Sequence, residues 1–449
     1  MRAPILLPFI TTVALCMAML SCLAPWAFAQ AATEPGTPGP LKIGIATADI
    51  TPEGSVYMAG FAARKDPSTG VYHKIEGACV VFDNGVARVG FLAFDLCKIQ
   101  EKQLADLRAA ADKAGIPPQH LMINVSHTHC GPTLGHKDNA AYDALFKERT
   151  DPLLQAAVDN LQPAVLDYTV GSCTMAVNRR QLGPDGQAVG MRPEPRKQID
   201  PDVPILRILA PDGKVRAVMF GYACHPTTMS GLEIGPDYPG FAREWVAAAY
   251  PDCVPVFLQG CGGDIKPRYC KPNGRFGYVL LEPIPTTTEV GHELGRAVIA
   301  ALAVPIQPVP ADRPQVLSEA ANAPVTIGGI VEFVKVPDKE DPEGKSHSIY
   351  MGAWRIGDVY VFGSQCEICS NIGLRIKREL ADVRVWTNGY THWGGGYIPD
   401  AASYPEGGYE VNVSRVSPAT EDILVGNAVR YVKELQRSPI HADPIVEQK

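Results

Sequence analysis

The sequence has no cluster of positive charge. Its 449 residues carry 41 lysines and arginines against 48 aspartates and glutamates, a formal net charge of -7 at pH 7, and the cations form no run. Nucleic-acid binding depends on clustered lysine and arginine side chains that neutralise phosphates. The composition therefore argues against DNA or RNA as a partner.

After residue 29 the sequence also lacks an apolar run of the roughly 20 residues that cross a bilayer. The first 29 residues differ, because Arg2 is followed by the mostly apolar Ile5–Leu23 and by a small-x-small site that ends at Ala29. This pattern is typical of a secretory signal peptide, so we expect cleavage after Ala29 and a secreted or periplasmic protein. The alternatives are a membrane anchor and lipid attachment at Cys22, whose preceding residues fit a lipoprotein signal poorly.

Internal repeats and low-complexity tracts are absent as well, while 42 glycines and 40 prolines predict many turns. We expect a flexible leader over residues 30–42, one folded domain over 43–437 and a tail over 438–449. The proline-rich residues 305–314 are the candidate sub-domain boundary, and the charged residues 336–348 predict a surface loop.

Short apolar runs alternate with helical patterns, which predicts an α/β fold of mixed sheets flanked by helices. The predicted strands are Ala78–Phe82, Ala87–Phe94, Leu121–Val125, Val203–Leu209, Val215–Ala223, Val254–Leu258, Val359–Gly363 and Val383–Thr387. The predicted helices are Glu101–Ala114, Asp143–Leu161, Gly240–Tyr250, Val290–Leu302 and Cys369–Leu380.

The sequence does not show whether the cysteines form disulfides or stay free thiols. Two of the 12 cysteines, Cys16 and Cys22, lie in the leader, and ten remain. An exported protein with ten cysteines can hold disulfides, but their pairing does not follow from sequence. Several of these cysteines lie in apolar runs, where a buried thiol fits equally well.

Polar side chains follow several predicted strands directly. Leu121–Val125 leads into His127 and His129, Val215–Ala223 into His225, and Val359–Gly363 into Glu367. Sites in open α/β sheets form beyond the carboxyl ends of strands. In an extended segment His127 and His129 share one face, which suits a metal ligand beside an acid or base. Surface histidines are the alternative for this pair, and the spacing alone leaves both open. The alternatives are a hydrogen-bonded structural histidine for His225 and an ordinary acid at a helix start for Glu367.

Two further segments carry candidate functional residues. Gln259–Pro267 follows another strand and holds three glycines, without the spacing of a phosphate-binding P-loop. The glycines either let the backbone approach a ligand closely or form a tight turn with no ligand. Within this segment, Lys266 is either a solvated side chain or a cation for an acidic substrate group. The aromatic and glycine-rich Asn388–Glu410 is either a packed surface loop or part of a site.

Five motifs together resemble the catalytic, N-terminal domain of the neutral/alkaline, non-lysosomal ceramidases. In order they are Ser126-His-Thr-His-Cys-Gly-Pro, Cys224-His-Pro-Thr, Gly235-Pro-Asp-Tyr-Pro-Gly, Gln259-Gly-Cys-Gly-Gly-Asp and Gly396-Tyr-Ile-Pro with Gly407-Gly-Tyr-Glu. The resemblance runs from about residue 43 to about 435. That family consists of zinc amidases that cleave the N-acyl bond of ceramide.

The resemblance implies one zinc ion per chain and a set of site residues. The implied ligands are His127, His225, Glu367 and Tyr397, of which Tyr397 rests on its twelve-residue step to Tyr409. The implied catalytic residues are His129, Tyr409 and Arg179. Substrate binding is expected at Asp264, Lys266 and Asp237. The metal site is expected at the carboxyl ends of strands.

The expected activity is that of an exported zinc-dependent amidohydrolase that uses a metal-activated water on a lipid-like linear amide. His129 would move the proton, while Tyr409 or Arg179 would stabilise the oxyanion. Lys266 stands where the family carries a serine proposed as nucleophile, and the family's immunoglobulin-like carboxyl-terminal domain is not expected here. The alternatives are another N-acyl or ester substrate, and a secreted binding protein without activity. Contact with a membrane surface and the oligomeric state stay open.

Overall fold

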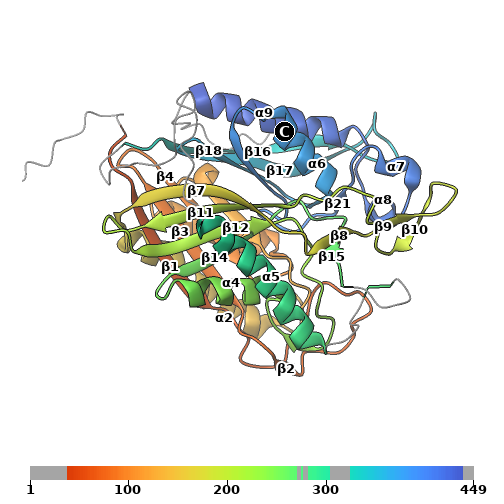
Figure 1. Ribbon diagram of the computed structural model, residues 1–449, viewed down its shortest axis with the longest axis horizontal. Helices are drawn as coiled ribbons and strands as arrows, with labels where there is room; N and C mark the ends of the chain where they lie inside the picture. Colours follow the sequence, from red (N-terminus) through yellow and green to blue (C-terminus); the bar gives the residue numbers. More distant parts are fainter. Residues whose placement is uncertain (1–37, 270–274, 277–281, 304–323, 438–449) are drawn as a thin grey trace, which may run out of the picture. The chain divides into compact units, whose positions relative to one another are not determined.

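The computed structural model describes residues 38–269, 275–276, 282–303 and 324–437 (Figure 1). The expected signal peptide, most of the leader, the candidate boundary at 305–314 and the tail lie outside these residues. Within them no helix is long and apolar enough to cross a membrane. The nine described cysteines are all buried and free of disulfides.

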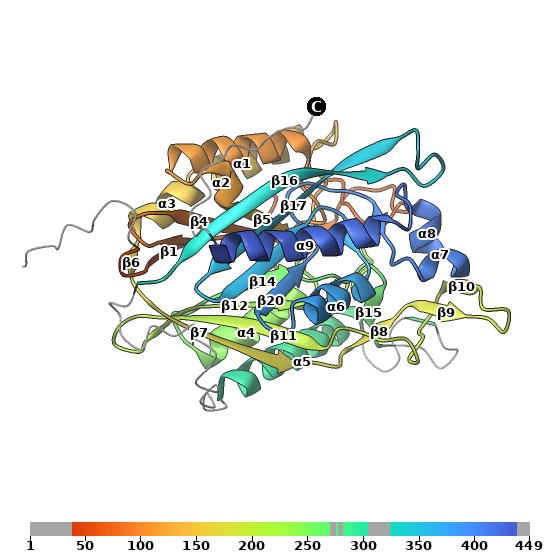
Figure 2. The same ribbon diagram turned by 90° about the horizontal axis from the view of Figure 1, so that it is seen from above.

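The first sheet has the strand order β5-β4-β3-β1-β6 and is covered by helices on one face (Figure 2). β4 and β5 run parallel, and the remaining pairs are antiparallel. The strands are β1 (Lys42–Asp49), β3 (Glu76–Asp83), β4 (Arg88–Phe94), β5 (Leu121–Val125) and β6 (Gln162–Pro163), and the helices are α1 (Glu101–Lys113), α2 (Ala140–Thr150) and α3 (Leu153–Asp159).

The second sheet has the order β14-β12-β11-β7, with β12 and β14 parallel. Helices α4 and α5 pack on each other and against this sheet, below it in Figure 1. The strands are β7 (Val165–Ser172), β11 (Asp202–Leu209), β12 (Val215–Tyr222) and β14 (Val254–Gln259), and the helices are α4 (Tyr238–Ala249) and α5 (Pro283–Ala303).

The third sheet has the order β16-β17-β18-β20, with β18 and β20 parallel, and helices α6 and α9 cover it. The strands are β16 (Ile327–Pro337), β17 (Ser346–Ile356), β18 (Val359–Ser364) and β20 (Arg384–Asn388), and the helices are α6 (Ser370–Glu379) and α9 (Thr420–Arg437). The largest buried apolar cluster joins all three sheets and includes Trp354 and Trp386.

Short elements connect the sheets around their strand ends. They are β2 (Gly70–Val71) with β13 (Glu233–Ile234), β8 (Ala176–Asn178) with β15 (Ile265–Pro267), β9 (Arg180–Leu182) with β10 (Ala188–Met191), β19 (Glu367–Ile368) with β21 (Tyr397–Ile398), the single turn Pro118–His120, α7 (Ser403–Glu406) and α8 (Tyr409–Val413).

The mixed α/β fold predicted from the sequence is confirmed, with two corrections. The helix expected over Asp143–Leu161 is two helices, because Pro152 has no N–H to continue the first. The charged segment 336–348 is not a continuous loop, because β16 extends to Pro337 and β17 starts at Ser346.

One buried amide joins the carboxyl ends of strands from all three sheets. Asn124 of β5 accepts a hydrogen bond from the Gln259 N–H of β14 (2.8 Å) and donates to the Gly389 carbonyl after β20 (3.0 Å) and to the Gln259 carbonyl (3.4 Å). Its side chain is fully buried. The three strand ends are therefore fixed to one another at this residue.

We expect Asn124→Ala to destabilise the fold by about 2–3 kcal/mol, because it leaves buried backbone groups without partners. Chemical denaturation measures the loss. The matched control is Asn427→Ala on α9, whose amide donates to Ile423 one helical turn away (2.8 Å) and stays partly exposed. Equal losses for the two variants would contradict this role of Asn124.

Candidate metal centre

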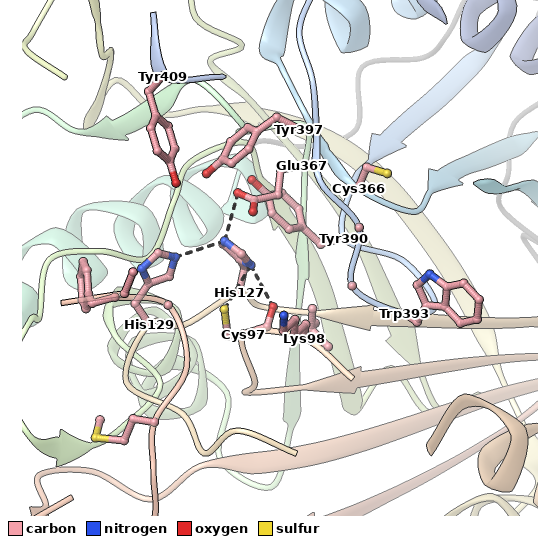
Figure 3. Close-up of a pocket in the computed structure, with 17 residues that line it drawn as sticks. Cys97, Lys98, His127, His129, Cys366, Glu367, Tyr390, Trp393, Tyr397 and Tyr409 are labelled. Carbon is pink, nitrogen blue, oxygen red and sulfur yellow. Dashed lines mark hydrogen bonds and ion pairs between the residues drawn. The ribbon is translucent and has the colours of Figure 1, made fainter. Parts of the chain in front are cut away.

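Three candidate ligands from three sheets meet at one point. His127 follows β5, His225 follows β12, and Glu367 lies in β19 shortly after β18. Glu367 Oε2 is 3.0 Å from His225 Nε2 and 3.2 Å from His127 Nε2. Both imidazoles are buried, and Figure 3 shows His127 next to Glu367, joined to it by a dashed line.

Backbone carbonyls fix which nitrogen of each ring faces the cluster. His127 Nδ1 lies 2.8 Å from the Cys97 carbonyl, and His225 Nδ1 lies 2.7 Å from the Gly262 carbonyl. Since a carbonyl only accepts, each Nδ1 carries the donated proton. In its neutral form each ring turns the lone pair of Nε2 toward Glu367, which is how second-shell groups orient histidine ligands of metals.

This donor set fits a divalent cation. Lone pairs at 3.0–3.2 Å repel unless a proton or a cation lies among them. Two ligand atoms of a tetrahedral zinc ion, each about 2.0 Å from the metal, are about 3.3 Å apart, which is close to the observed spacing. Cys97, His127 and His129 form a second group that could hold a metal ion, and it shares His127 with the first.

The charges of the cluster are strongly coupled. Burial opposes a charge on His127, but Cys97 and Glu367 outweigh burial and raise the pKa of its imidazole well above the usual range. Burial and Arg179 lower the pKa of His225 to about 4. Burial raises the pKa of Glu367, but the two histidines outweigh it and hold that pKa well below the usual range. A cation that displaces the His127 proton binds more tightly as pH rises.

Tyr397 lies beside Glu367 because the two-residue strands β19 and β21 pair in parallel, with these two residues in register. The Tyr397 hydroxyl is 3.3 Å from His225 Nε2 and accepts a hydrogen bond from Arg179 Nη2 (3.1 Å). The structure thus brings the oxygen of Tyr397 to His225, and it pairs the Tyr397 backbone with that of Glu367.

Arg179 is held by Glu410, the last residue of the Gly407-Gly-Tyr-Glu motif, for which the sequence predicted no role. Its Nε donates to Glu410 Oε1 (2.7 Å), and the adjacent Arg180 donates to Glu410 Oε2 (2.7 Å). All three side chains are buried. Glu410 follows Tyr409, whose half-exposed ring lies 5.5 Å from that of Tyr397, so this ion pair also anchors Tyr409 at the pocket.

His129 reaches the cluster by a turn and not by strand alternation. Its Nε2 is 3.1 Å from His127 Nε2, but His127 has a left-handed backbone with φ of 65°, so the expected extended segment is wrong. Gly60, with φ of 100°, makes room for the ring, since a Cβ there would lie 2.4 Å from His129 Cγ. Burial and the two other histidines lower the pKa of His129 well below its usual value.

The cluster opens into a cavity of about 360 Å³, within the usual range for small-molecule sites. Figure 3 shows Tyr409 and Tyr397 on the side of Glu367 away from Cys97. The lining residues are Met58, Gly60, Phe61, Ala62, Cys97, Lys98, Val125, His127, His129, Cys366, Glu367, Tyr390, Trp393, Gly394, Gly395, Tyr397 and Tyr409. Cys97 was not predicted, although it follows β4, the parallel neighbour of β5.

The three expected substrate-binding residues lie apart from this cavity. Asp237 caps α4 by accepting from the Tyr238 and Met229 N–H groups (both 2.7 Å). Asp264 accepts from Ser370 N–H (2.7 Å) at the start of α6. Neither is among the residues that line the cavity, whereas Lys266 lines a second cavity next to it. Substrate binding at these residues stays a prediction.

Two crystal structures have the same arrangement of elements. A neutral ceramidase from Pseudomonas aeruginosa aligns with a TM-score of 0.71 over 91% of this chain and 76% of its own, at 18% identity. A ceramidase complexed with C2 aligns with the same score and identity over 91% of this chain and 77% of its own. This chain has the neutral ceramidase fold. The resemblance of the five motifs is therefore confirmed at the level of the fold.

Sequence comparison adds nothing to this likeness. No protein-family model matches the chain, and no curated protein matches it. At 18% identity a shared neutral ceramidase fold leaves the activity open, so function has to be argued from the site.

We expect the purified chain to hold one zinc ion, and His225→Ala to lose it, because that variant removes one of three converging donors. Elemental analysis after dialysis measures the metal content. The control is His347→Ala, which removes a histidine of β17 that pairs with Asp338 instead (2.7 Å). The metal centre would be refuted if circular dichroism found both variants folded and both kept the metal.

Proposed function

We propose that the protein is a zinc-dependent hydrolase of N-acyl amides with a lipid-like acyl chain. The observation that carries this proposal is the convergence of His127, His225 and Glu367 beside His129, at the wall of a cavity that His127, His129 and Glu367 line and that is large enough for a substrate. Two imidazoles, a carboxylate and a nearby phenol form a donor set that suits zinc. The neutral ceramidase fold supports amides as the substrate class.

The bound ion would supply a Lewis acid and make a water molecule acidic enough to lose a proton near neutral pH. The protein's own residues then have to position the amide and move protons. No serine nucleophile is required for this chemistry, so Lys266 in place of the family's serine is compatible with hydrolysis.

His129 is the candidate for proton transfer. Its Nε2 points at the cluster, 3.1 Å from His127 Nε2, and burial together with the two other histidines lowers the pKa of its ring. A neutral imidazole accepts a proton from the attacking water and can return it to the nitrogen that leaves. His129 therefore lies on the side of the site that receives the amine half of the substrate.

Arg179 and Tyr409 are the candidates for oxyanion stabilisation. Arg179 donates to the Tyr397 hydroxyl, and its charge is balanced by the buried Glu410. Tyr409 stands at the rim with 42% of its surface exposed, free to donate its hydroxyl to a substrate oxygen. Fixed donors of this kind stabilise charge that develops on a carbonyl oxygen.

The cavity beyond the ligands suits an acyl chain. It is lined by the apolar side chains of Met58, Phe61, Val125 and Trp393.

We further propose that the protein is exported by its amino-terminal signal peptide and acts on a lipid amide outside the cytoplasm.

The test is hydrolysis of N-dodecanoylsphingosine and N-dodecanoylethanolamine, with release of dodecanoate measured by mass spectrometry. We expect 1,10-phenanthroline to abolish release and added zinc to restore it. His129→Ala should keep the zinc but lower kcat by about 10²–10⁴-fold, the usual contribution of a general acid and base.

The control for His129→Ala is His136→Ala, a histidine that packs on Tyr57 and does not line the cavity. It should hydrolyse both amides like the unaltered chain. Release of dodecanoate that resists the chelator, or that is unchanged in His129→Ala, would refute the proposed mechanism.

A further inference from the structure

A second cavity of about 160 Å³ lies next to the first. Phe61 lines both cavities, and its ring meets the His129 ring edge to face, with centroids 4.8 Å apart. The lining residues of the second cavity are Phe61, Thr227, Thr228, Ser230, Lys266, Pro267, Tyr269 and Phe276.

The wall of this cavity is built from segments that also position a candidate metal ligand. Thr227 follows His225 by two residues. The His225 N–H donates to the Ile265 carbonyl (3.1 Å), and Lys266 is the next residue of β15. The second cavity is therefore tied directly to the His225 side of the metal centre.

The polar groups of the second cavity are of the kind that binds an oxyanion. Among the described residues that line it, Lys266 is the one cation and none is acidic. The Lys266 ammonium lies 5.0 Å from the centre of the Phe276 ring. The Thr227 hydroxyl oxygen is buried and has no hydrogen-bond partner among the described residues. An ammonium with a hydroxyl donor is a typical partner for carboxylate, sulfonate or phosphate oxygens.

We propose that this second cavity binds an oxyanion on the amine half of the substrate, with Lys266 as its counter-ion. The inference rests on the proposed function, in which His129 returns a proton to the leaving nitrogen. The amine half then leaves on the side of His129, where Phe61 contacts the His129 ring and lines both cavities. The acyl half occupies the rest of the larger cavity. The preferred substrates are therefore N-acyl amino acids or similar acidic amides.

The test compares matched ligands. The probes are the N-octanoyl amides of glycine, β-alanine and 4-aminobutyrate, each paired with the neutral N-octanoyl amino alcohol of the same length. Their KM is measured with the zinc-loaded enzyme, and their Kd by calorimetry with the chelator-treated full chain. We expect at least one carboxylate to bind about tenfold more tightly than its alcohol, as a charge-assisted hydrogen bond gives.

Lys266→Gln should bring the ratio of the alcohol's Kd to the carboxylate's Kd close to one. The control is Lys98→Gln, which removes an exposed cation of the larger cavity and should leave this ratio unchanged. Equal affinity of the unaltered chain for each carboxylate and its alcohol would overturn the inference. So would loss of selectivity in Lys98→Gln alone. If neither class is hydrolysed but Lys266-dependent selectivity remains in the calorimetry, the proposed function fails and the oxyanion site stands.

Discussion

The arrangement of the site depends on how three strand ends are held together. Each large sheet contains one parallel pair, and the Asn124 amide bonds the ends of β5, β14 and β20 at 2.8–3.4 Å. Backbone bonds add to it, since the His392 N–H donates to the Ile123 carbonyl (2.7 Å). Because the candidate ligands follow strands of different sheets, their convergence requires this junction and cannot arise within any one sheet.

Backbone strain gathers at the same junction. His127, Cys366, Tyr390 and His392 all have φ between 56° and 84°, a region that costs a side-chain-bearing residue of order 1–3 kcal/mol. Such conformations persist only where the surroundings over-determine them. Here the strained backbone turns the His127 ring toward Glu367. The Tyr390 ring lies against the His127 ring, with the two centroids 4.4 Å apart. The packed sheets therefore stabilise a geometry that the local sequence alone would not adopt.

Sequence reasoning succeeded where a signal was local and continuous. Leu121–Val125 is buried at every residue, so its bounds and the histidines after it followed from the apolar run. The β16–β17 hairpin was missed because its charged turn dominates the pattern. The pairing of Glu367 with Tyr397 rests on strands of two residues, too short for any periodicity. The ion pair of Arg179 with Glu410 joins residues 231 positions apart, and nothing in the sequence near either residue identifies the other as its partner.

In the proposed function, the segment from Gly263 to Pro267 contributes both to the candidate metal centre and to substrate recognition. A metal centre that activates water needs no nucleophile from the protein, so the position of Lys266 is not constrained by bond cleavage. Its neighbour Ile265 is constrained, because that carbonyl holds the His225 backbone at 3.1 Å. This contact is made by the backbone carbonyl of residue 265, so the side chain at position 266 can vary without removing it. In the proposed function, substrate choice can therefore change at this position while the arrangement of the candidate metal ligands stays fixed.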